Sequence, residues 1–510
     1  MARFAGAVPR FAPQGVARAG QQPCRNSLTQ GLLVCKGIYS VMGMPPGACH
    51  IIPNAGVMVL ALLYGEGDFD RTINICNMCG WDTDCNVGNI ATIMGVLKGV
   101  EGIDYQKWIA PIHDLLICSS VVGSLNIMDT PYSASTIARW AYALAGEPVP
   151  EPWADILENA MDSCHFEYPG STHSIRVRGE DPDKPLEAYL RNTDEQARTG
   201  HRSLKIGVPG RRPADAVYVY KKTYYYARDF HDSRYDPCFS PTLYPGQTVR
   251  ASVFIPDSGC DVQACLYVHE GHDDRLLFSE PVRAGKGRWV DLSYVIPRLE
   301  GGLIDEAGVC FRVLGEHGMS RLTLQAYLDG LCFEGKPDYS LLLSREKTEN
   351  WTATHREITQ FTRLKGLMYL ENERLHLSCA DFAEAYTGRH DWEDYEARFR
   401  LAIHAGEHAF VNFRVQGAMR SYAAGFDGRG RFALKKNDGG YTELASTAFE
   451  WERDRTYEIT ATVRGGEICV ACGEAKLRWR DDAPWLRGAV GLSAFLGTHV
   501  SLESISVNGL

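Results

Sequence analysis

The sequence predicts a multidomain α plus β protein, in which a partial all-α bundle is followed by two antiparallel β-sandwich (jelly-roll) domains. Three observations support this prediction. A chain of 510 residues is too long for one hydrophobic core. Apolar residues recur with a helical period between about residues 48 and 146, and with a period of two from about residue 203 onward.

Composition narrows the classes of partner. The net charge of -10 argues against nucleic acid, because phosphate binders carry a basic surface. No apolar run approaches the roughly 18 residues that a membrane span needs. The 16 cysteines are irregularly spaced and several lie in apolar segments, which favours reduced core thiols over a disulfide framework. We expect a cytoplasmic protein, with secretion as the alternative, and the sequence leaves the oligomeric state open.

The N-terminus has an unusual composition. The first 65 residues contain no Asp or Glu, and the opening is rich in Ala, Gly, Pro and Arg. A transit-type segment has this character, and an artefactual start of the reading frame is the alternative. We therefore expect residues 1–46 to be an atypical, disordered segment.

Residues 47–150 have the pattern of a helical domain. Asp68 is a good N-cap for one helix, and Gly80 suits its C-terminal stop. The apolar run after Asp84 predicts a buried helix, and the glycines in it predict close approach of another backbone. Further helices are expected at 105–117 and 133–145. His113 and Asp114 are predicted to be a surface pair, with a base–acid role as the alternative.

Two carboxylates stand at the start of the predicted buried helix, in the sequence Gly80-Trp81-Asp82-Thr83-Asp84. At a turn that leads into a helix, Asp82 and Asp84 can converge on one point. Carboxylate oxygens suit a hard divalent ion such as Mg²⁺ or Mn²⁺. The alternative is N-terminal capping, because acids at a helix start satisfy free N–H groups and the helix dipole.

The surroundings of this motif resemble the ADP-ribosylglycohydrolase family. Gly-x-Asp-Thr-Asp before a small-residue-rich helix, preceded by Ile52-Pro53-Asn54-Ala55 and a Gly-Asp-Phe-Asp turn, carries the resemblance over residues 49–102. The family fold is an all-α bundle that holds a pair of divalent ions and hydrolyses glycosidic bonds to ADP-ribose or related groups. The resemblance implies that Asp82 and Asp84 bind Mg²⁺ or Mn²⁺, and that Trp81 and Asn86 contact substrate.

The chain departs from the family pattern in three places. Cys85 stands where the family usually has Thr or Ser, and a thiol is a weak ligand for a hard ion. Trp81 replaces a small residue. The family's N-terminal Gly-Asp segment and Thr-Asp-Asp motif are not found. The resemblance is therefore to the C-terminal part of the catalytic domain with half of its metal site, which puts the activity of the chain in doubt, and it assigns no catalytic residue.

The rest of the chain is expected to form a linker and two β-sandwiches. Pro-rich and charged turn sequences predict a linker over residues 151–202. Residues 203–345 resemble carbohydrate-binding jelly rolls, and residues 354–510 resemble concanavalin or LamG-type sandwiches. Tyr422, Tyr441 and Trp451 could stack on sugar rings, although core packing is favoured for each.

Two functions remain in competition at this point. The first is metal-assisted hydrolysis of a glycosidic bond in an ADP-ribosylated or glycan substrate. The second is non-enzymatic carbohydrate binding, with the helical domain as a remnant. Neither reading involves nucleic acid or a membrane span.

Overall fold

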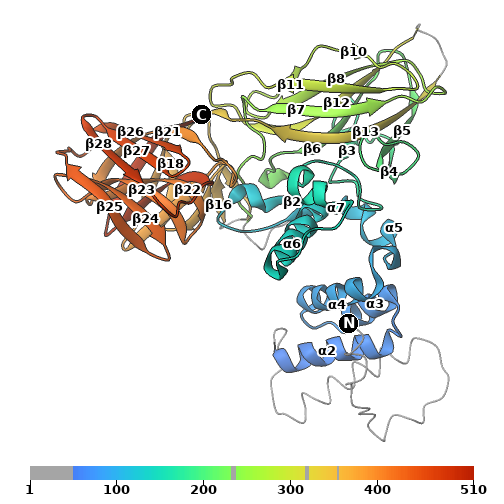
Figure 1. Ribbon diagram of the computed structural model, residues 1–510, viewed down its shortest axis with the longest axis horizontal. Helices are drawn as coiled ribbons and strands as arrows, with labels where there is room; N and C mark the ends of the chain where they lie inside the picture. The colour runs from blue at the N-terminus through green and yellow to red at the C-terminus, as the bar shows by residue number, and fades with distance from the viewer. Residues whose placement is uncertain (1–49, 231–236, 316–320, 353–354) are drawn as a thin grey trace, which may run out of the picture. The chain divides into compact units, whose positions relative to one another are not determined.

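The computed structural model describes residues 50–230, 237–315, 321–352 and 355–510. These residues belong to two compact units, Met1–Pro111 and Ile112–Leu510 (Figure 1). The helical beginning and the antiparallel β-sheets that follow it confirm the predicted multidomain α plus β class. The segment expected at 1–46 lies outside the described residues.

The first unit is helical where it is described. Asp68 accepts a hydrogen bond from the Arg71 amide at 2.7 Å, and Gly80 has a φ of +79° beyond the end of the second helix, so both predicted helix signals are confirmed. Its helical elements are α2 (Ile51–Tyr64), α3 (Phe69–Met78), α4 (Thr83–Lys98), η1 (Val100–Gly102) and α5 (Tyr105–Trp108), followed by η2 (Ala110–Ile112) at the boundary.

Helix α4 is less buried than its apolar sequence predicts. Ile90 and Met94 enter the core of the unit, but Val96 is 76% exposed and Leu97 66% exposed. A Cβ built at Gly88 or Gly95 would meet no described atom within 4 Å. The expected close approach of another backbone is therefore wrong for these two glycines within the described chain. Among the described helices, none has the length and apolar character needed to cross a membrane.

The second unit begins with a mixed segment that packs against β-strands. The sequence placed residues 47–150 in one helical domain, whereas the compact units separate between Pro111 and Ile112. Long-range polar contacts of Asp114 and Asp129 explain why the later part belongs with the strands. Its elements are β1 (Leu115–Ile117), η3 (Gly123–Asn126), β2 (Ile127–Asp129), α6 (Thr130–Ala145), α7 (Trp153–Asp155) and η4 (Ile156–Ala160).

Asp114 is buried and holds a distant loop, so the predicted surface pair with His113 is wrong. Its Oδ2 accepts hydrogen bonds from the Ser171 hydroxyl at 2.8 Å and from the Thr172 amide at 2.7 Å. The His173 amide donates to the same oxygen at 3.2 Å. One carboxylate therefore orders the turn that precedes the first sandwich.

Asp129 joins helix α6 to the first sandwich. It caps α6 by accepting from the Tyr132 amide at 2.8 Å, and it is 2% exposed. Its Oδ2 pairs with Lys221 Nζ at 2.5 Å and lies 3.3 Å from His173 Nδ1. Burial opposes ionisation, but the charges of Lys221 and His173 hold the pKa of Asp129 well below its ordinary value.

The first sandwich starts earlier than the sequence predicts. Residues 151–202 were expected to be a linker, yet β3 pairs with β6 and β4 pairs with β5. Turn residues dominate the composition there and conceal these short strands. One sheet has the order β10-β8-β12-β6-β3 with β9 beside β8, and the other has the order β11-β7-β13-β5-β4. The bounds are β3 (Arg176–Arg178), β4 (Tyr189–Thr193), β5 (Ser203–Arg211), β6 (Ala216–Lys222), η5 (Ala227–Asp229), β7 (Thr248–Phe254), β8 (Val262–Glu270), β9 (Arg275–Phe278), β10 (Val282–Arg283), β11 (Trp289–Val295), β12 (Ile304–Val313) and β13 (Leu322–Glu334).

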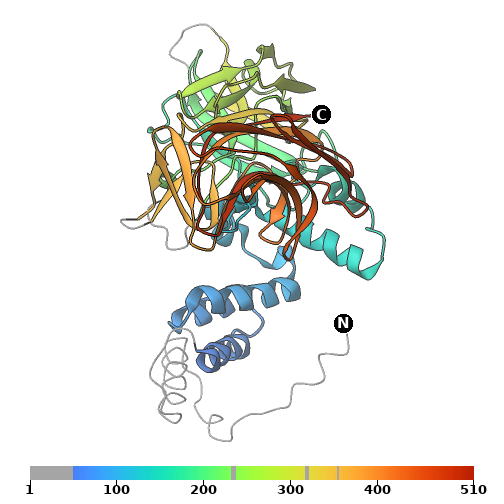
Figure 2. The same cartoon turned by 90° about the vertical axis from the view of Figure 1, so that its left-hand side faces the viewer.

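The C-terminal sandwich begins before residue 354, because β14 pairs with the last strand, β30. Figure 2 shows its strands, orange to red, in curved layers. Its sheets have the orders β18-β19-β30-β21-β26-β27-β28, with β14 beside β30, and β17-β20-β29-β22-β23-β24-β25. The bounds are β14 (Asp338–Leu342), β17 (Thr362–Lys365), β18 (Leu367–Glu371), β19 (Arg374–Ser378), β20 (Phe382–Thr387), β21 (Tyr395–Ala405), β22 (His408–Gly417), β23 (Arg420–Asp427), β24 (Arg431–Asp438), β25 (Tyr441–Ala448), β26 (Thr456–Arg464), β27 (Glu467–Cys472), β28 (Ala475–Arg480), β29 (Ala489–Phe495) and β30 (His499–Gly509).

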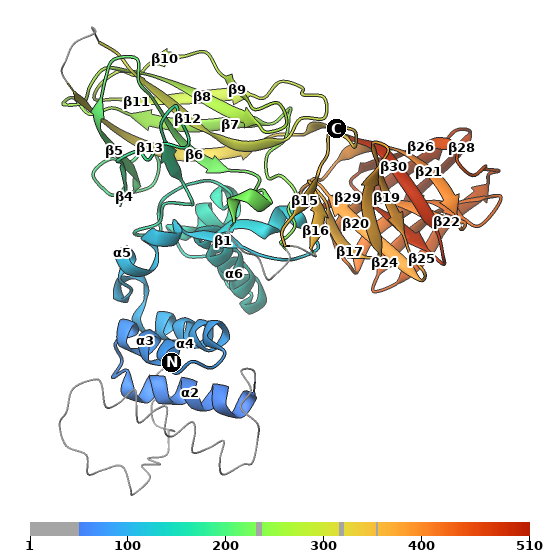
Figure 3. The same ribbon diagram turned by 180° about the vertical axis from the view of Figure 1, so that it is seen from behind.

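A small hairpin, β15 (Thr348–Asn350) and β16 (Arg356–Ile358), lies in the chain between β14 and β17 (Figure 3). Its strands pair only with each other among the described elements. Glu357 of the hairpin lies close to Cys238 in the loop before β7.

We expect Asp129→Asn to destabilise the second unit by about 3 kcal/mol, since removal of one partner leaves a buried charge unpaired. Chemical denaturation followed by tryptophan fluorescence measures this change. Asp181→Asn, which removes the exposed pair with Lys184, is the matched control and should leave the midpoint unchanged. Equal midpoints for Asp129→Asn and the wild type would show that the pair is dispensable.

The same comparison has a defined pH dependence. A folded-state pKa held below the unfolded value stabilises the fold above the unfolded pKa, and this contribution is lost as the pH falls. The stability difference between wild type and Asp129→Asn should therefore be constant near neutrality and shrink below about pH 4, where unfolded aspartates become protonated. Denaturation series across this range measure the difference, and a gap that widens on acidification would contradict the assignment.

Candidate functional site

The predicted acidic motif forms a cluster at the start of α4. One ligand atom from each of Asp82, Asp84 and Cys85 lies within 4.8 Å of the others. Asp82 is partly exposed, while Asp84 and Cys85 are exposed. The structure thus brings together the three residues that the sequence singled out as metal ligands.

The side-chain amides of two asparagines form a series of hydrogen bonds that ends at the Asp82 carboxylate. Asn54 in α2 donates from Nδ2 to Asp82 Oδ2 at 3.2 Å. Asn86 in α4 donates from Nδ2 to Asn54 Oδ1 at 3.3 Å. Asn54 is therefore a site residue that the motif alone did not reveal, although Ile52-Pro53-Asn54-Ala55 had already drawn attention to it.

The two residues expected to contact substrate lie in different environments. Asn86 is only 2% exposed, so its side chain supports Asn54 and has little surface for a ligand. Trp81 is half-buried and packs against the core of the unit. Of the pair, Trp81 is better placed to meet a bound molecule.

The capping alternative describes only part of the geometry. Asp82 occupies the N-cap position of α4, but its side chain caps none of the helix amides. Asp84 lies in the first turn, where the helix dipole favours a negative charge. The position of Asp84 fits either explanation, whereas the side chain of Asp82 is turned toward Asn54 and the cluster.

The donor set fits a hard divalent ion only in part. Two carboxylates supply the oxygen ligands that Mg²⁺ and Mn²⁺ prefer. The Cys85 thiol is a soft donor and a poor third ligand for these ions. Within the described residues the cluster therefore offers two suitable protein ligands and one weak one.

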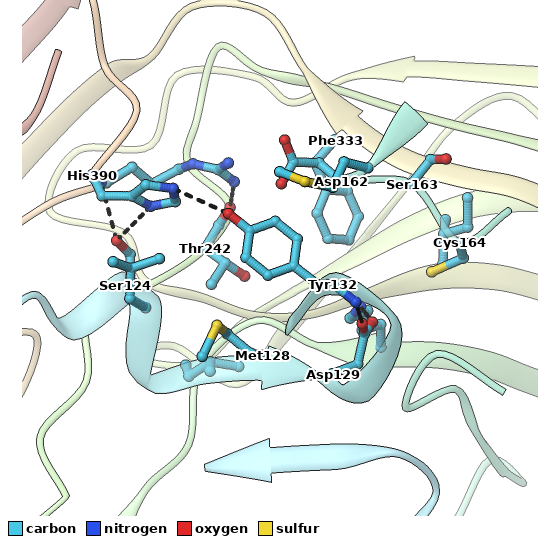
Figure 4. Close-up of a pocket in the computed structure, with 16 residues that line it drawn as sticks. Ser124, Met128, Asp129, Tyr132, Asp162, Ser163, Cys164, Thr242, Phe333 and His390 are labelled. Carbon is cyan, nitrogen blue, oxygen red and sulfur yellow. Dashed lines mark hydrogen bonds and ion pairs between the residues drawn. The ribbon is translucent and has the colours of Figure 1, made fainter. Parts of the chain in front are cut away.

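The second unit contains a cavity of about 70 Å³ with both polar and apolar walls, shown in Figure 4. Its walls come from α6 and the residues before it, from β6 and β13 of the first sandwich, and from the loop that precedes β21. The lining residues are Ser124, Leu125, Ile127, Met128, Asp129, Tyr132, Met161, Asp162, Ser163, Cys164, Lys221, Thr242, Leu331, Phe333, Arg389 and His390.

Two carboxyl groups in this cavity differ in their proton affinity. Asp129 is held ionised by its buried ion pair with Lys221. The protein packed around Asp162 raises the pKa of its carboxyl, and the Arg389 charge offsets this effect in part. Asp162 is nevertheless accessible to water. A carboxyl of raised pKa in a cavity can exchange a proton with a bound molecule.

Tyr132 extends across the cavity toward His390 (Figure 4). The Tyr132 hydroxyl lies 3.3 Å from His390 Nε2, and the Ser124 hydroxyl lies 3.3 Å from Nδ1. Burial lowers the pKa of His390 to about 4, so the ring is neutral near pH 7. Burial likewise raises the pKa of Tyr132 to about 12. The pair can therefore donate and accept hydrogen bonds without carrying a charge.

The C-terminal sandwich carries an open groove at the edge formed by β26, β27 and β28. Arg464, Arg478 and Arg480 share the face of the sheet that lines this groove, whereas Trp479 is paired with the core residue Ile468 and points to the other face. In the described part of the chain these arginines form no ion pair, and Glu467 is the one carboxylate in the groove lining. A group of guanidinium side chains on one face suits an anionic molecule.

The aromatic residues considered from sequence for sugar stacking are mainly structural. Tyr422 is 0% exposed and donates to Asp481 Oδ2 at 2.5 Å. Tyr441 donates to Glu384 Oε1 at 2.7 Å, and Trp451 Nε1 donates to the Gly428 carbonyl at 3.0 Å. Core packing, the favoured alternative, describes all three. Sequence reasoning missed the arginine-lined groove, because the strand pairing that brings Arg464, Arg478 and Arg480 to one face cannot be read from composition.

Comparisons with solved structures find β-sandwich carbohydrate modules and lectin-like domains. The carbohydrate-binding module CBM66 from Bacillus subtilis is 15% identical, with a TM-score of 0.27, covering 29% of this chain and 95% of that one. The tandem CBM22-1–CBM22-2 domain of Paenibacillus barcinonensis Xyn10C is 13% identical, with a TM-score of 0.24, covering 68% and 97%. The VIP36 exoplasmic/lumenal domain in its Ca²⁺/Man-bound form is 15% identical, with a TM-score of 0.25, covering 30% and 84%. Scores this low place no constraint on what the chain binds.

Sequence comparison gives a more specific result for the N-terminal part. No curated protein matches the chain. A family model described as ADP-ribosylglycohydrolase matches residues 9–159. This match confirms the resemblance drawn from residues 49–102 and extends it in both directions. Residues 9–159 of this chain thus match the ADP-ribosylglycohydrolase family, and the Asp82, Asp84 and Cys85 cluster lies inside the matched segment.

Proposed function

We propose that this protein acts in metal-assisted hydrolysis of a glycosidic bond to ADP-ribose or a related glycoconjugate. One observation carries the proposal: the ligand atoms of Asp82, Asp84 and Cys85 converge within 4.8 Å inside the segment that matches the ADP-ribosylglycohydrolase family. The side chain of Asp82 makes no capping contact that would account for its position.

The residues of the chain have distinct roles in this proposal. Asp82 and Asp84 hold a divalent ion, Mg²⁺ or Mn²⁺. Asn54 fixes the orientation of Asp82 through its 3.2 Å hydrogen bond, as outer residues do for metal-bound carboxylates. When bound, a divalent ion at this position supplies Lewis acidity and lowers the pKa of a water molecule. Trp81 borders the cluster and provides an apolar surface for substrate.

Cys85 limits the affinity of this cluster. A thiol contributes little to binding a hard ion, so the two carboxylates must provide most of the protein's contribution. We infer weak metal binding and correspondingly low activity for this chain, in keeping with the half-site expected from its motif.

The first test is titration of the full chain with Mn²⁺, followed by the loss of the free-ion EPR signal. Asp82→Asn and Asp84→Asn should abolish binding at the cluster. Asn54→Ala should weaken it about tenfold, since it removes an outer hydrogen bond. Cys85→Ser should tighten Mn²⁺ binding, because a hydroxyl is a harder ligand than a thiol. Release of ADP-ribose from ADP-ribosylated protein should follow the same order.

Glu101→Gln provides the matched control, since Glu101 is an exposed acid of the same unit outside the cluster. It should bind Mn²⁺ like the wild type. Binding that survives both Asp82→Asn and Asp84→Asn would refute the assignment of the site. Metal binding without any ADP-ribose release would retain the site and remove the enzymatic role.

We propose carbohydrate binding as the second candidate function, and the arginine-lined groove on β26, β27 and β28 supports it. Arginine pairs with carboxylate or sulfate groups in a fork geometry. Three arginines without ion-pair partners in the described chain favour an acidic saccharide, such as a uronate or a sulfated sugar, over a neutral one.

Isothermal titration of the full chain with acidic and neutral oligosaccharides tests this candidate. We expect binding of the acidic series only, weakened by added salt and lost in Arg464→Gln and Arg478→Gln. Trp140→Ala is the control, because Trp140 is 60% exposed on α6, away from the groove. If no acidic sugar binds, or if Arg478→Gln binds as the wild type does, the candidate fails.

A further inference from the structure

A second cluster of metal-ligating side chains lies beside the hairpin β15–β16. Figure 3 labels the two strands of this hairpin. One ligand atom from each of Cys238, His355 and Glu357 lies within 4.8 Å of the others. Cys238 comes from the loop before β7, whereas His355 directly precedes β16 and Glu357 lies within it. Residues two apart on a strand share a face, so the imidazole and the carboxylate of the hairpin point together toward Cys238.

We propose that Cys238, His355 and Glu357 form a zinc site. Thiolate, imidazole and carboxylate are the three donor types that Zn²⁺ takes from proteins, and three protein ligands leave one position of a tetrahedron for water or another molecule. The thiol and the imidazole favour Zn²⁺ over Mg²⁺ or Mn²⁺, because these hard ions prefer oxygen ligands.

The carboxylate of Glu357 has an oxygen available for a metal. Glu357 is 6% exposed. Its Oε1 lies 2.8 Å from His355 Nε2 and 3.3 Å from Arg363 Nη2. Its Oε2 is buried and accepts no hydrogen bond from the described residues. A buried acceptor without a partner is costly, and a bound cation would satisfy it.

A neighbouring carboxylate adds an independent argument. Glu349 of β15 is paired directly with Glu357 across the hairpin. Both side chains border one small cavity, together with Cys238, Trp351 and Phe239. Like charges directly opposite on neighbouring strands repel each other. A divalent cation beside Glu357 would offset this repulsion.

Hydrogen bonds and strand pairing hold the backbone on both sides of the cluster. Asn126 Nδ2 donates to the Cys238 carbonyl at 2.6 Å, and the hairpin is held by pairing of Thr348 with Ile358 and of Asn350 with Arg356. Arg363 donates to Oε1 of Glu357, so Oε2 remains available to a metal. Outer contacts of this kind orient metal-bound carboxylates in known sites.

Zinc binding requires one proton to leave. The Sγ–H bond of Cys238 breaks, the proton passes to solvent, and the sulfur donates an electron pair to Zn²⁺ without any change of oxidation state. The affinity should therefore rise with pH until the thiol is fully replaced by thiolate. A plain ion-pair cluster of His355, Glu357 and Arg363 would show no such coupling to a thiol.

The experiment uses the full chain after removal of metals with a chelator. Zn²⁺ affinity is measured in competition with a chromophoric chelator, and Co²⁺ serves as a spectroscopic probe. We expect one tight site whose Co²⁺ form shows thiolate-to-metal charge-transfer absorption. Cys238→Ser should abolish that absorption. Cys238→Ser and Glu357→Gln should each weaken Zn²⁺ binding by at least about tenfold. Loss of a residue that only hydrogen-bonds to a metal ligand already costs this much, so loss of a ligand should cost no less.

Two control variants separate this site from other thiols. Cys85→Ser removes the thiol of the α4 cluster, and Cys332→Ser removes a partly buried thiol of β13 that belongs to neither cluster. Both should keep the tight site and its absorption. Absorption lost in Cys85→Ser, or Zn²⁺ affinity unchanged in Cys238→Ser, would overturn the proposal.

A measurement on the wild-type chain covers the case in which a variant fails to fold. Zn²⁺ should slow alkylation of Cys238 by iodoacetamide, as followed by peptide mass spectrometry, while leaving Cys332 unaffected. Equal rates for Cys238 with and without Zn²⁺ would likewise overturn the zinc site.

Discussion

The second unit depends on a buried charge at Asp129. A carboxylate that is 2% exposed must be paired, and its partners, Lys221 and His173, come from distant parts of the chain. The same carboxylate caps α6. It therefore links the start of this helix to the turn at His173 and to Lys221 of strand β6. Asp114 reinforces the arrangement through the backbone of residues 172 and 173. The cavity at Tyr132 lies where these elements meet.

This network divides the segment that matches the ADP-ribosylglycohydrolase family. The match runs over residues 9–159, but the compact units separate between Pro111 and Ile112. The acidic cluster of α4 belongs to the first unit, whereas Ser124, Asp129 and Tyr132 line a cavity built partly from β-strands. The segment that matches the family therefore belongs to two compact units. Its part after Pro111 takes its hydrogen-bond and ion-pair partners from the first sandwich.

The sequence predicted helix ends and strands correctly where these depend only on neighbouring residues. The Asp68 cap, the Gly80 stop and the alternation in strands such as β7 and β8 each depend on a few neighbouring residues. Asp114 was misjudged because its partners lie 57 to 59 residues away. Strands β3 and β4 were missed because their pairing, not their composition, makes them strands. The convergence of Asp82 and Asp84 was predictable from spacing, but Asn54 needed the contact between α2 and α4.

The two metal-ligating clusters differ in ways that should separate their ions. The cluster of α4 offers two carboxylates and an exposed thiol, and water reaches all three ligands. Water competes well for a hard ion held by few protein ligands, so binding there should be weak. The hairpin cluster offers an imidazole, a thiol and a buried carboxylate with an unsatisfied oxygen. Softness and burial both favour zinc at the hairpin. The thiol of Cys85 therefore weakens the first cluster for a hard ion, whereas the thiol of Cys238 strengthens the second cluster for zinc. Residue chemistry, more than the number of acids, thus decides which ion each cluster can hold.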